Sequence, residues 1–384
     1  MTGGDRWPVR PKPGEAVPTP FGMSAYCVGD PAAHAPDRDA LVVVHGPGDD
    51  SRWTFAEVDD VVRAVAAGLL GLGLQSGDRV LLRMGNRAHF PFVFFGAIAA
   101  GLVAVPTSAQ LTADEAAGLL ADSGARAVAL DPDLDLAVPQ GISVITSDDV
   151  GRWVADGERA EHDLGDPDRP AFITYTSGTT GRPKGAELTH RNLDLNAKRT
   201  AEDIIQISPD DVVMGCLPLF HVFGLTCGLN ASVRTGATLT LIPRFDPGKV
   251  LEVIARDKVT IFEGVPTMYG AMLHHPAVSE TDTSSLRTCV SGGSSLPGET
   301  LREFEETFKV SLLEGYGLSE TSPVASFNML DKPTKPGTIG RAIPGCEMKL
   351  IGEDGQAVGP GEGVGEIAIR GDNVMKGYWN KPEA

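Results

Sequence analysis

The chain has 384 residues, of which 42% are hydrophobic and 22% are charged, a globular composition with room for two or three domains. Its 51 acidic residues outnumber the 33 basic ones and give a formal charge of -18, which repels nucleic acid and anionic lipid and disfavours both as partners. Five widely spaced cysteines without a C-x-x-C pair indicate reduced thiols of a cytoplasmic protein and argue against a disulfide framework or a zinc site.

The N-terminal segment and two long uncharged stretches bear on location. Residues 1–20 carry charge and proline where a signal peptide needs an apolar core, so we expect an extended arm. Residues 88–113 contain an apolar core of only 14 residues, and residues 212–233 are interrupted by a proline, a histidine and an asparagine. Because roughly 20 apolar residues are needed to span a bilayer, we predict core elements and at most peripheral membrane contact.

Strands and helices alternate in the first part of the chain. Thr54 and Glu57 form a capping box that predicts the start of a helix, and Thr112 with Glu115 predicts another. A further helix is expected within 88–113. Apolar strands are predicted at 78–84, 102–106 and 126–130. Alternation at this spacing is typical of a parallel sheet with helices on both faces.

The same alternation resumes after residue 170. Asp246 and Pro247 predict a helix start, and Pro297 predicts another. Three predicted strands, 171–176, 286–290 and 310–314, each run into a glycine-rich loop: TSGTTG, SGGSS and EGYGLSE. Because ligands bind at the carboxyl ends of strands in doubly wound sheets, we expect these three loops to converge on one crevice.

From about residue 330 the pattern changes to short β-type segments separated by turns, such as 347–351 and 366–370. The fold class expected is therefore α/β, with two doubly wound, mainly parallel sheets, flanking helices and a small barrel-like β subdomain. The expected divisions are an arm at 1–20, a first α/β subdomain at 21–170, a second α/β subdomain with the binding sites at 171–330, and a β subdomain at 331–384.

The glycine-rich loop that follows the strand 171–176 has the composition of a polyphosphate site. Its glycines allow close backbone approach, its threonines and serine supply hydroxyl donors, and Lys184 supplies charge. The spacing is not that of the Walker motif, because Lys184 follows Gly181 by three and precedes Gly185. The plain alternative is a flexible surface loop.

Five motifs in one order resemble a known enzyme family. TYTSGTTGRPKG (174–185) resembles the phosphate-binding signature of the AMP-forming acyl and aryl adenylating enzymes, which include acyl-CoA synthetases, firefly luciferase and peptide-synthetase adenylation domains. PLFHVFG (218–224) resembles the acyl-pocket motif, SGGSSLP (291–297) the adenine-side loop, EGYGLSET (314–321) the adenine and metal motif, and residues 365–384 the β-subdomain motif. The pattern is most similar to bacterial long-chain fatty acyl-CoA ligases.

This resemblance implies a two-step reaction that uses ATP, Mg²⁺ and coenzyme A. A carboxylate attacks the α-phosphate of ATP and expels pyrophosphate, and the acyl-adenylate then passes its acyl group to a thiol. Attack of one anion on another needs charge neutralisation, which Mg²⁺, a lysine and oriented donors provide.

The resemblance also implies a role for each matched position. Glu320 should bind Mg²⁺, and Ser319 should contact the α-phosphate in place of the threonine that is commoner in the family. The phosphate-binding positions are Thr176, Ser177, Gly178, Thr179, Thr180, Gly181 and Lys184. The adenine-binding positions are Gly292, Gly293 and Ser294 on one side and Gly315, Tyr316 and Gly317 on the other.

Three of these positions have plain structural alternatives. The alternative interpretation of Glu320 is a solvated loop carboxylate, and that of Tyr316 is a core aromatic residue. His221 is read otherwise as a core histidine, whereas the resemblance makes it a pocket-wall residue near the reacting carboxylate. The expected catalytic set is Thr176, Lys184, His221, Ser319 and Glu320.

The expected acid is apolar. Relatives that activate amino acids place an aspartate where this chain has His221, and neither pocket stretch, 216–230 or 263–272, offers an arginine for a dicarboxylate. The expected acyl-pocket residues are Phe220, His221, Phe223, Gly224, Val265, Thr267 and Met268, with Leu217, Leu219, Leu225, Leu229 and Met272 as further lining. A medium- or long-chain fatty acid is predicted, and an aryl acid such as a cinnamate is the alternative.

The chain stops at Ala384, inside the last motif. The resemblance implies a further mobile C-terminal domain that carries the adenylation lysine, so we expect this chain to be a large N-terminal domain with little complete turnover. Two other classes stay open: a non-catalytic acyl- or nucleotide-binding module, and a phosphotransferase that would release ADP. Oligomeric state is not indicated.

Overall fold

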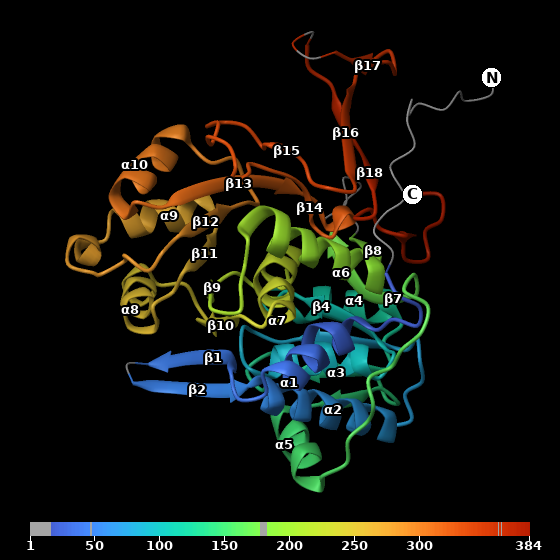
Figure 1. Cartoon of the computed structure of the whole chain (residues 1–384). Helices are drawn as coiled ribbons and strands as arrows, with labels where there is room; N and C mark the ends of the chain where they lie inside the picture. The colour runs from blue at the N-terminus through green and yellow to red at the C-terminus, as the bar shows by residue number, and fades with distance from the viewer. Residues whose placement is uncertain (1–16, 47, 177–182, 360, 362) are drawn as a thin grey trace.

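The computed structural model describes residues 17–46, 48–176, 183–359, 361 and 363–384. Two large sheets and one small sheet form the molecule, with helices covering the large sheets (Figure 1). The expected N-terminal arm lies almost entirely outside the described residues. Among the described helices, none has both the length and the apolar character required to cross a lipid bilayer.

The first large sheet has seven strands in the order β19-β8-β7-β4-β3-β5-β6. Five neighbouring strands are parallel, and two antiparallel strands extend one edge. The parallel strands are β3 (Arg79–Arg83), β4 (Val103–Thr107), β5 (Ala127–Leu130), β6 (Ser143–Ile145) and β7 (Pro170–Thr176), and the antiparallel strands are β8 (Lys184–Thr189) and β19 (Gly377–Tyr378).

Two helices of this half begin where the sequence predicts. Both predicted capping boxes are present, with the Thr54 hydroxyl accepting from Glu57 N and the Thr112 hydroxyl from Glu115 N. A similar box at Thr146 starts a helix that the sequence reading did not identify. The helices are α1 (Asp30–His34), α2 (Phe55–Gly71), α3 (His89–Ala99), α4 (Ala113–Ser123) and α5 (Ser147–Asp156), preceded by the π-helix η1 (Ala25–Gly29).

The second large sheet has nine strands in the order β15-β14-β13-β12-β11-β9-β10-β1-β2. Its six central strands are parallel, and antiparallel strands close both edges. The parallel strands are β1 (Asp39–Gly46), β9 (Val212–Gly215), β10 (Thr238–Leu241), β11 (Ile261–Gly264), β12 (Thr288–Ser291) and β13 (Ser311–Gly317). The antiparallel strands are β2 (Asp49–Thr54), β14 (Val324–Phe327) and β15 (Arg341–Ala342).

Helices cover both faces of the nine-stranded sheet. One face packs against α8 (Pro247–Asp257), α9 (Pro266–Leu273) and α10 (Gly298–Phe308) through a separate apolar cluster. The other face shares its core with the seven-stranded sheet. The elements between the two sheets are α6 (His190–Arg199), the π-helices η2 (Thr200–Ile205) and η3 (Phe223–Asn230), and α7 (Ala231–Arg234); short 3-10 turns are η4 (Pro276–Ser279) and η5 (Ser319–Thr321).

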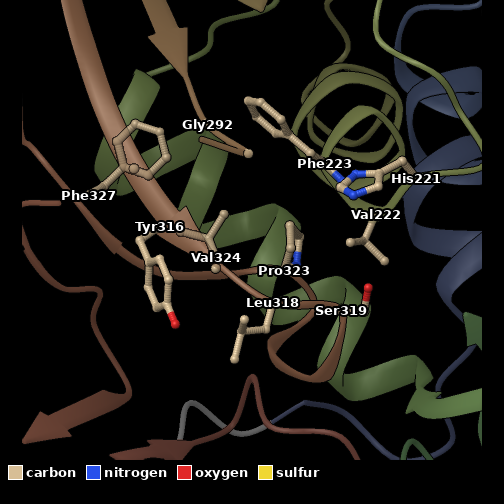
Figure 2. Close-up of a pocket in the computed structure, with 13 residues that line it drawn as sticks. His221, Val222, Phe223, Gly292, Tyr316, Leu318, Ser319, Pro323, Val324 and Phe327 are labelled. Atoms are coloured by element: carbon tan, nitrogen blue, oxygen red, sulfur yellow. The ribbon is translucent and has the colours of Figure 1, made fainter. Parts of the chain in front are cut away.

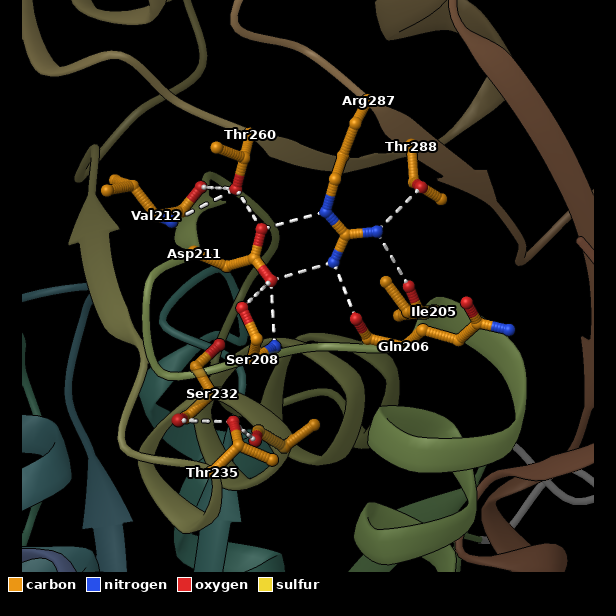
Figure 3. Close-up of polar contacts among 11 residues, drawn as sticks. Ile205, Gln206, Ser208, Asp211, Val212, Ser232, Thr235, Thr260, Arg287 and Thr288 are labelled. Atoms are coloured by element: carbon orange, nitrogen blue, oxygen red, sulfur yellow. Dashed lines mark hydrogen bonds and ion pairs between the residues drawn. The ribbon is translucent and has the colours of Figure 1, made fainter.

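A partly buried ion pair fixes the amino-terminal ends of β9 and β12 relative to each other (Figure 3). Arg287 donates to both carboxylate oxygens of Asp211 at 2.8 and 2.7 Å, and Thr260 and the Ser208 backbone donate to the same carboxylate. Burial alone would raise the pKa of Asp211, but these hydrogen bonds outweigh it and lower the pKa to about 2. The carboxylate therefore stays charged at neutral pH and holds the strand register at that end.

The small sheet contains β17 (Ala357–Val358), β16 (Cys346–Ile351) and β18 (Glu366–Gly371), all antiparallel. It projects from the rest of the molecule (Figure 1). The expected β subdomain is present, but in the described residues it forms an open sheet and not a barrel. The reason is that the chain leaves it after β18 and returns to the body, where β19 pairs with β8.

Sheet membership crosses the expected boundary at residue 170. Strands β1 and β2 precede that position but belong to the nine-stranded sheet, whereas β7 and β8 follow it and belong to the seven-stranded sheet. The expected divisions of the chain therefore stay a prediction. A second difference concerns β13, which was expected to end at residue 314 and continues to Gly317 because it pairs with β14.

Candidate active site

Three of the sequence motifs meet at one cavity of about 180 Å³. Figure 2 shows the labelled side chains arranged around it from separate elements. The expected convergence of glycine-rich loops is thus confirmed for the adenine-side loop and the EGYGLSE motif, which the acyl-pocket motif joins. The cavity is lined by His221, Val222, Phe223, Gly292, Gly293, Gly315, Tyr316, Gly317, Leu318, Ser319, Pro323, Val324 and Phe327.

Parallel pairing of β12 with β13 explains why two of these motifs meet. Ser291 pairs with Glu314, so the loop after β12 and the end of β13 leave the sheet at the same edge. A side chain would be excluded at Gly317 and crowded at Gly292, where the walls come closest. A Cβ at Gly292 would lie 3.1 Å from the Phe223 ring, and a Cβ at Gly317 would lie 2.0 Å from the carbonyl oxygen of Pro323. Without side chains at these two positions, the neighbouring segments can approach each other closely around the cavity.

His221 faces the cavity from the turn before η3. Its Nδ1 accepts a hydrogen bond from Phe223 N at 3.2 Å, which leaves the proton of the neutral ring on Nε2. The ring is accessible from the cavity, but burial of its other sides lowers the pKa of His221 below its usual value. The imidazole is therefore neutral at neutral pH, and its N–H forms no hydrogen bond to the residues that the structure describes.

The expected acyl-pocket residues are only partly brought together. His221 and Phe223 line the cavity, whereas Gly224 lies behind it, where a Cβ would meet the Pro218 carbonyl oxygen at 2.6 Å. Val265 lies next to the lining residue Gly293, where a Cβ would be 3.6 Å from Val265 Cγ1, but it does not line the cavity itself. Phe220, Thr267 and Met268 do not line it. The other expected lining residues, Leu217, Leu219, Leu225, Leu229 and Met272, are buried in the cores.

The phosphate-binding positions are described only at their two ends. Ser177, Gly178, Thr179, Thr180 and Gly181 lie outside the described residues. Thr176 ends β7 and Lys184 begins β8, and the two residues are partners across the antiparallel pair. The Thr176 hydroxyl donates to the Lys184 carbonyl oxygen at 3.4 Å. Two of the five residues expected to be catalytic therefore pair directly with each other at the ends of the two strands.

Glu320 lies in η5, directly after Ser319 of the cavity wall. The hydroxyl of Tyr378 donates to Glu320 Oε1 at 2.7 Å, and Lys184 Nζ lies 5.0 Å from the centre of the Tyr378 ring. Burial and the Glu320 carboxylate raise the pKa of Tyr378 to about 12, so the phenol is protonated and is the donor. Tyr378 thus joins the expected metal ligand to the expected phosphate lysine.

The sequence reading missed several residues of this site. Tyr378 lies in the matched motif 365–384, but nothing local in the sequence indicates that it contacts Glu320 or Lys184. Val222, Leu318, Pro323, Val324 and Phe327 line the cavity without having been expected to. Ser294 was expected beside the adenine, but it follows the lining glycines without lining the cavity itself.

The described residues fit a magnesium ion that is shared with a substrate. They contain no group of three or more acidic, histidine or cysteine side chains that could hold a metal on their own. Mg²⁺ bound with a nucleotide commonly uses one or two carboxylates and takes its other ligands from phosphate oxygens and water. Glu320, which follows Ser319 and shares the partner Tyr378 with Lys184, is such a carboxylate.

A family profile described as AMP-binding enzyme matches residues 29–379. The chain belongs to the AMP-binding enzyme family. Long-chain-fatty-acid--CoA ligase of Bacillus subtilis (strain 168) is 32% identical over 419 residues, covering 96% of this chain and 72% of that protein. Feruloyl-CoA synthase of an Amycolatopsis species is 35% identical over 356 residues, covering 90% and 70%. These relatives place it among the AMP-forming acyl-CoA ligases, which use ATP, Mg²⁺ and coenzyme A.

Solved structures of the family agree with this fold. The anthranilate CoA ligase AuaEII, in complex with anthranoyl-AMP, matches with a TM-score of 0.87 and 25% identity, covering 96% of this chain and 72% of that one. The N-terminal domain of FACL13 from Mycobacterium tuberculosis matches with a TM-score of 0.86 and 29% identity, covering 94% and 92%. The expected fold class and family are therefore confirmed, whereas the named relatives differ in the acid they activate.

Proposed function

We propose that this chain holds the nucleotide and acid sites of a fatty acid–CoA ligase of the AMP-forming type, with a medium- or long-chain fatty acid as its substrate. The observation that carries the proposal is the shared cavity, in which the acyl-pocket motif faces the two adenine motifs. Adenine lies between Gly292–Gly293 and Tyr316 in this proposal, and the acid enters past His221 and Phe223. The α-phosphate and the carboxylate then meet near Ser319.

The residues of the chain neutralise and orient the two anions. Lys184 and Thr176 bind the outer phosphates together with the intervening loop, and Ser319 donates to the α-phosphate. The Nε2–H of neutral His221 donates a hydrogen bond to the substrate carboxylate and holds this carboxylate in line with the phosphorus. Mg²⁺, held by Glu320, supplies the remaining charge neutralisation when it is bound.

The apolar character of the acid pocket supports an alkyl substrate. Val222 and Phe223 form its wall, and η3, which begins at Phe223, is buried along its whole length without a charged side chain. An apolar chain gains about 0.8 kcal/mol for each buried methylene, so a longer acid binds more tightly wherever the pocket extends. An aryl-acid CoA ligase is the second candidate, favoured by the 35% identity to feruloyl-CoA synthase and by the aromatic ring of Phe223 in the cavity wall.

Binding of two acyl-adenylate mimics tests the proposal and separates the two candidates. We expect 5′-O-(N-palmitoylsulfamoyl)adenosine to bind this chain at least about tenfold more tightly than the feruloyl compound in calorimetric titrations, because more apolar surface is buried. Tighter binding of the feruloyl compound would favour the aryl candidate. Failure of both compounds to bind would contradict the proposed function altogether.

A lysine variant distinguishes an enzyme-type nucleotide site from a simple lipid-binding module. Lys184→Ala should weaken MgATP binding by about tenfold or more, since it removes a charge-assisted contact to phosphate. Lys335→Ala, at an exposed position outside the cavity lining, is the matched control and should leave binding unchanged. If the chain binds fatty acid but shows no measurable binding of MgATP, the result would instead indicate an acyl carrier.

We infer cytoplasmic action from the acidic composition and from five buried, free cysteines. The proposed partners are the acid, ATP and coenzyme A. Nucleic acid is disfavoured by the charge of the chain, and at most peripheral membrane contact is expected.

A further inference from the structure

Tyr378 is held at a fixed position beside the end of the phosphate-binding loop. Its strand β19 pairs with β8, with Tyr378 opposite Ala186 and Gly377 opposite Glu187. The backbone on either side is bonded as well, since Trp379 N donates to the Gly185 carbonyl oxygen at 2.8 Å and Lys376 N to the Glu187 carbonyl oxygen at 2.9 Å. The tyrosine therefore lies on a paired strand and not on a free tail.

Two oppositely charged groups use different parts of this side chain. The hydroxyl donates to Glu320 Oε1 at 2.7 Å, and the ring has Lys184 Nζ 5.0 Å from its centre. Met375 N also donates to the Glu320 carbonyl oxygen at 2.8 Å, so the same segment fixes both the backbone and the side chain of that residue. Neither Lys184 nor Glu320 forms an ion pair within the part of the chain that the structure describes.

The arrangement solves an electrostatic problem of an ATP site. Lys184 and Glu320 are both partly buried and both contact Tyr378, and a direct ion pair between such a lysine and carboxylate would neutralise both. A phenol partners each group without adding charge, because its hydroxyl satisfies the carboxylate while its ring face attracts the ammonium. Each group thereby has a contact other than its opposite charge and is available to a ligand.

We propose that Tyr378 is a positioning residue that separates Lys184 from Glu320, leaving the lysine for the triphosphate and the carboxylate for its Mg²⁺. The inference rests on the proposed function for the identity of the two ligands. The separation of the two charges is a property of the chain itself and can be tested without nucleotide.

Two substitutions divide the proposal into its parts. Tyr378→Phe keeps the ring over Lys184 and removes the bond to Glu320, whereas Tyr378→Leu removes both contacts. In calorimetric titrations of the chain, Tyr378→Phe should weaken ATP binding about fivefold with Mg²⁺ and leave it unchanged in EDTA, because one hydrogen bond to the metal ligand is lost. Tyr378→Leu should weaken binding under both conditions, since Lys184 then pairs with Glu320.

A double variant provides the decisive comparison. Adding Glu320→Gln to Tyr378→Leu should restore the affinity measured in EDTA to the value of the parent chain, because the lysine loses its competing partner. If the double variant binds ATP in EDTA no better than Tyr378→Leu, the proposed separation is wrong. Tyr26→Phe, a tyrosine packed against Phe21 and outside the cavity, is the matched control and should change neither affinity.

A readout without nucleotide keeps this inference separate from the proposed function. In a spectrum of the reductively ¹³C-methylated chain, the Lys184 signal, assigned by Lys184→Arg, should be shifted upfield by the Tyr378 ring in the parent and in Tyr378→Phe. Glu320→Gln should move that signal only when Tyr378→Leu is also present. An equal response to Glu320→Gln in the parent chain would overturn the inference. If the spectrum is as expected but the chain does not bind ATP, only the proposed function would be contradicted.

Discussion

Glu263 is a carboxylic acid inside the core of the molecule. Its side chain is 1% exposed, and Oε1 has no hydrogen-bond partner among the described residues. The π-helix η3 packs directly on it, since a Cβ at Gly228 would lie 3.2 Å from Glu263 Oε2. Burial raises the pKa of Glu263 from 4.5 to about 8, so the group is mostly neutral at pH 7.

This shift predicts a specific dependence of stability on pH. The unfolded chain releases the proton near pH 4.5, whereas the folded chain retains it until about pH 8. The contribution of Glu263 protonation to the free energy of unfolding is therefore fully present below pH 4.5. It decreases as the pH rises between these two values, by about 1.4 kcal/mol per pH unit. Glu263→Gln keeps the shape and has no proton to lose, so it should be free of this slope.

Urea unfolding at about pH 5.5, 6.5 and 7.5, between the pKa values of the unfolded and folded states, measures this pH dependence of stability. The difference between the variant and the parent should grow in favour of the variant as the pH rises. Glu252→Gln, at an exposed position of α8, is the control and should follow the parent at every pH. Parallel curves for the parent and Glu263→Gln would show that the carboxyl group is ionised in the folded chain.

At the level of elements, local signals in the sequence predicted helix starts well. The boxes at Thr54 and Thr112 involve side chains three residues from the backbone they cap, so the whole interaction is visible in a short window. The glycine-rich loops after β12 and β13 were predictable for a similar reason, because a buried strand next to a turn marks the carboxyl edge of a sheet.

Pairings between distant segments could not be predicted in this way. The β8–β19 pair joins residues 186 and 378, and the Tyr378–Glu320 contact spans 58 positions. No periodicity or spacing encodes either contact. The placement of β1 and β2 in the nine-stranded sheet also depends on pairing with β10, about 200 residues away. The motifs that form the site could therefore be identified from the sequence, but the role of Tyr378 between Glu320 and Lys184 could not.

The docking of β19 leads to a prediction about local stability. Trp379 Nε1 donates to the Asp122 carbonyl oxygen at 3.2 Å, and the Arg79 guanidinium lies 5.1 Å from the indole centre. Trp379→Ala removes both contacts, so hydrogen exchange at the amides of Lys376 and Trp379 should become about tenfold faster, as expected for a local opening that is more favourable by roughly 1.4 kcal/mol.

Exchange measured by mass spectrometry on peptides from this region and from β3 separates local from global effects. Peptides from β3 should exchange at the parent rate, because the core of the seven-stranded sheet is unaffected. Trp153→Ala, on α5 and away from the site, is the control and should leave the 376–379 amides protected. Equal acceleration in all peptides would mean that Trp379 stabilises the whole fold and not only β19.

At the scale of the whole molecule, the two large sheets share one core. The largest apolar cluster includes Val80 and Leu82 of β3 together with Ile261 and Leu313 of β11 and β13. The chain also crosses between the sheets more than once, through β1–β2 and through β19. Neither sheet can therefore lose its packing without exposing apolar surface of the other.

This architecture predicts that the two sheets unfold in one transition. Fluorescence of a probe attached near α5 and of a second probe attached near α10 should report the same denaturation midpoint, coincident with that of far-UV circular dichroism. Independent subdomains divided at residue 170 would give two midpoints, because each would expose its own surface at its own denaturant concentration. The interleaved strands favour the first outcome, since separating 21–170 from the remainder would remove β1 and β2 from the edge of the sheet that carries the proposed active site.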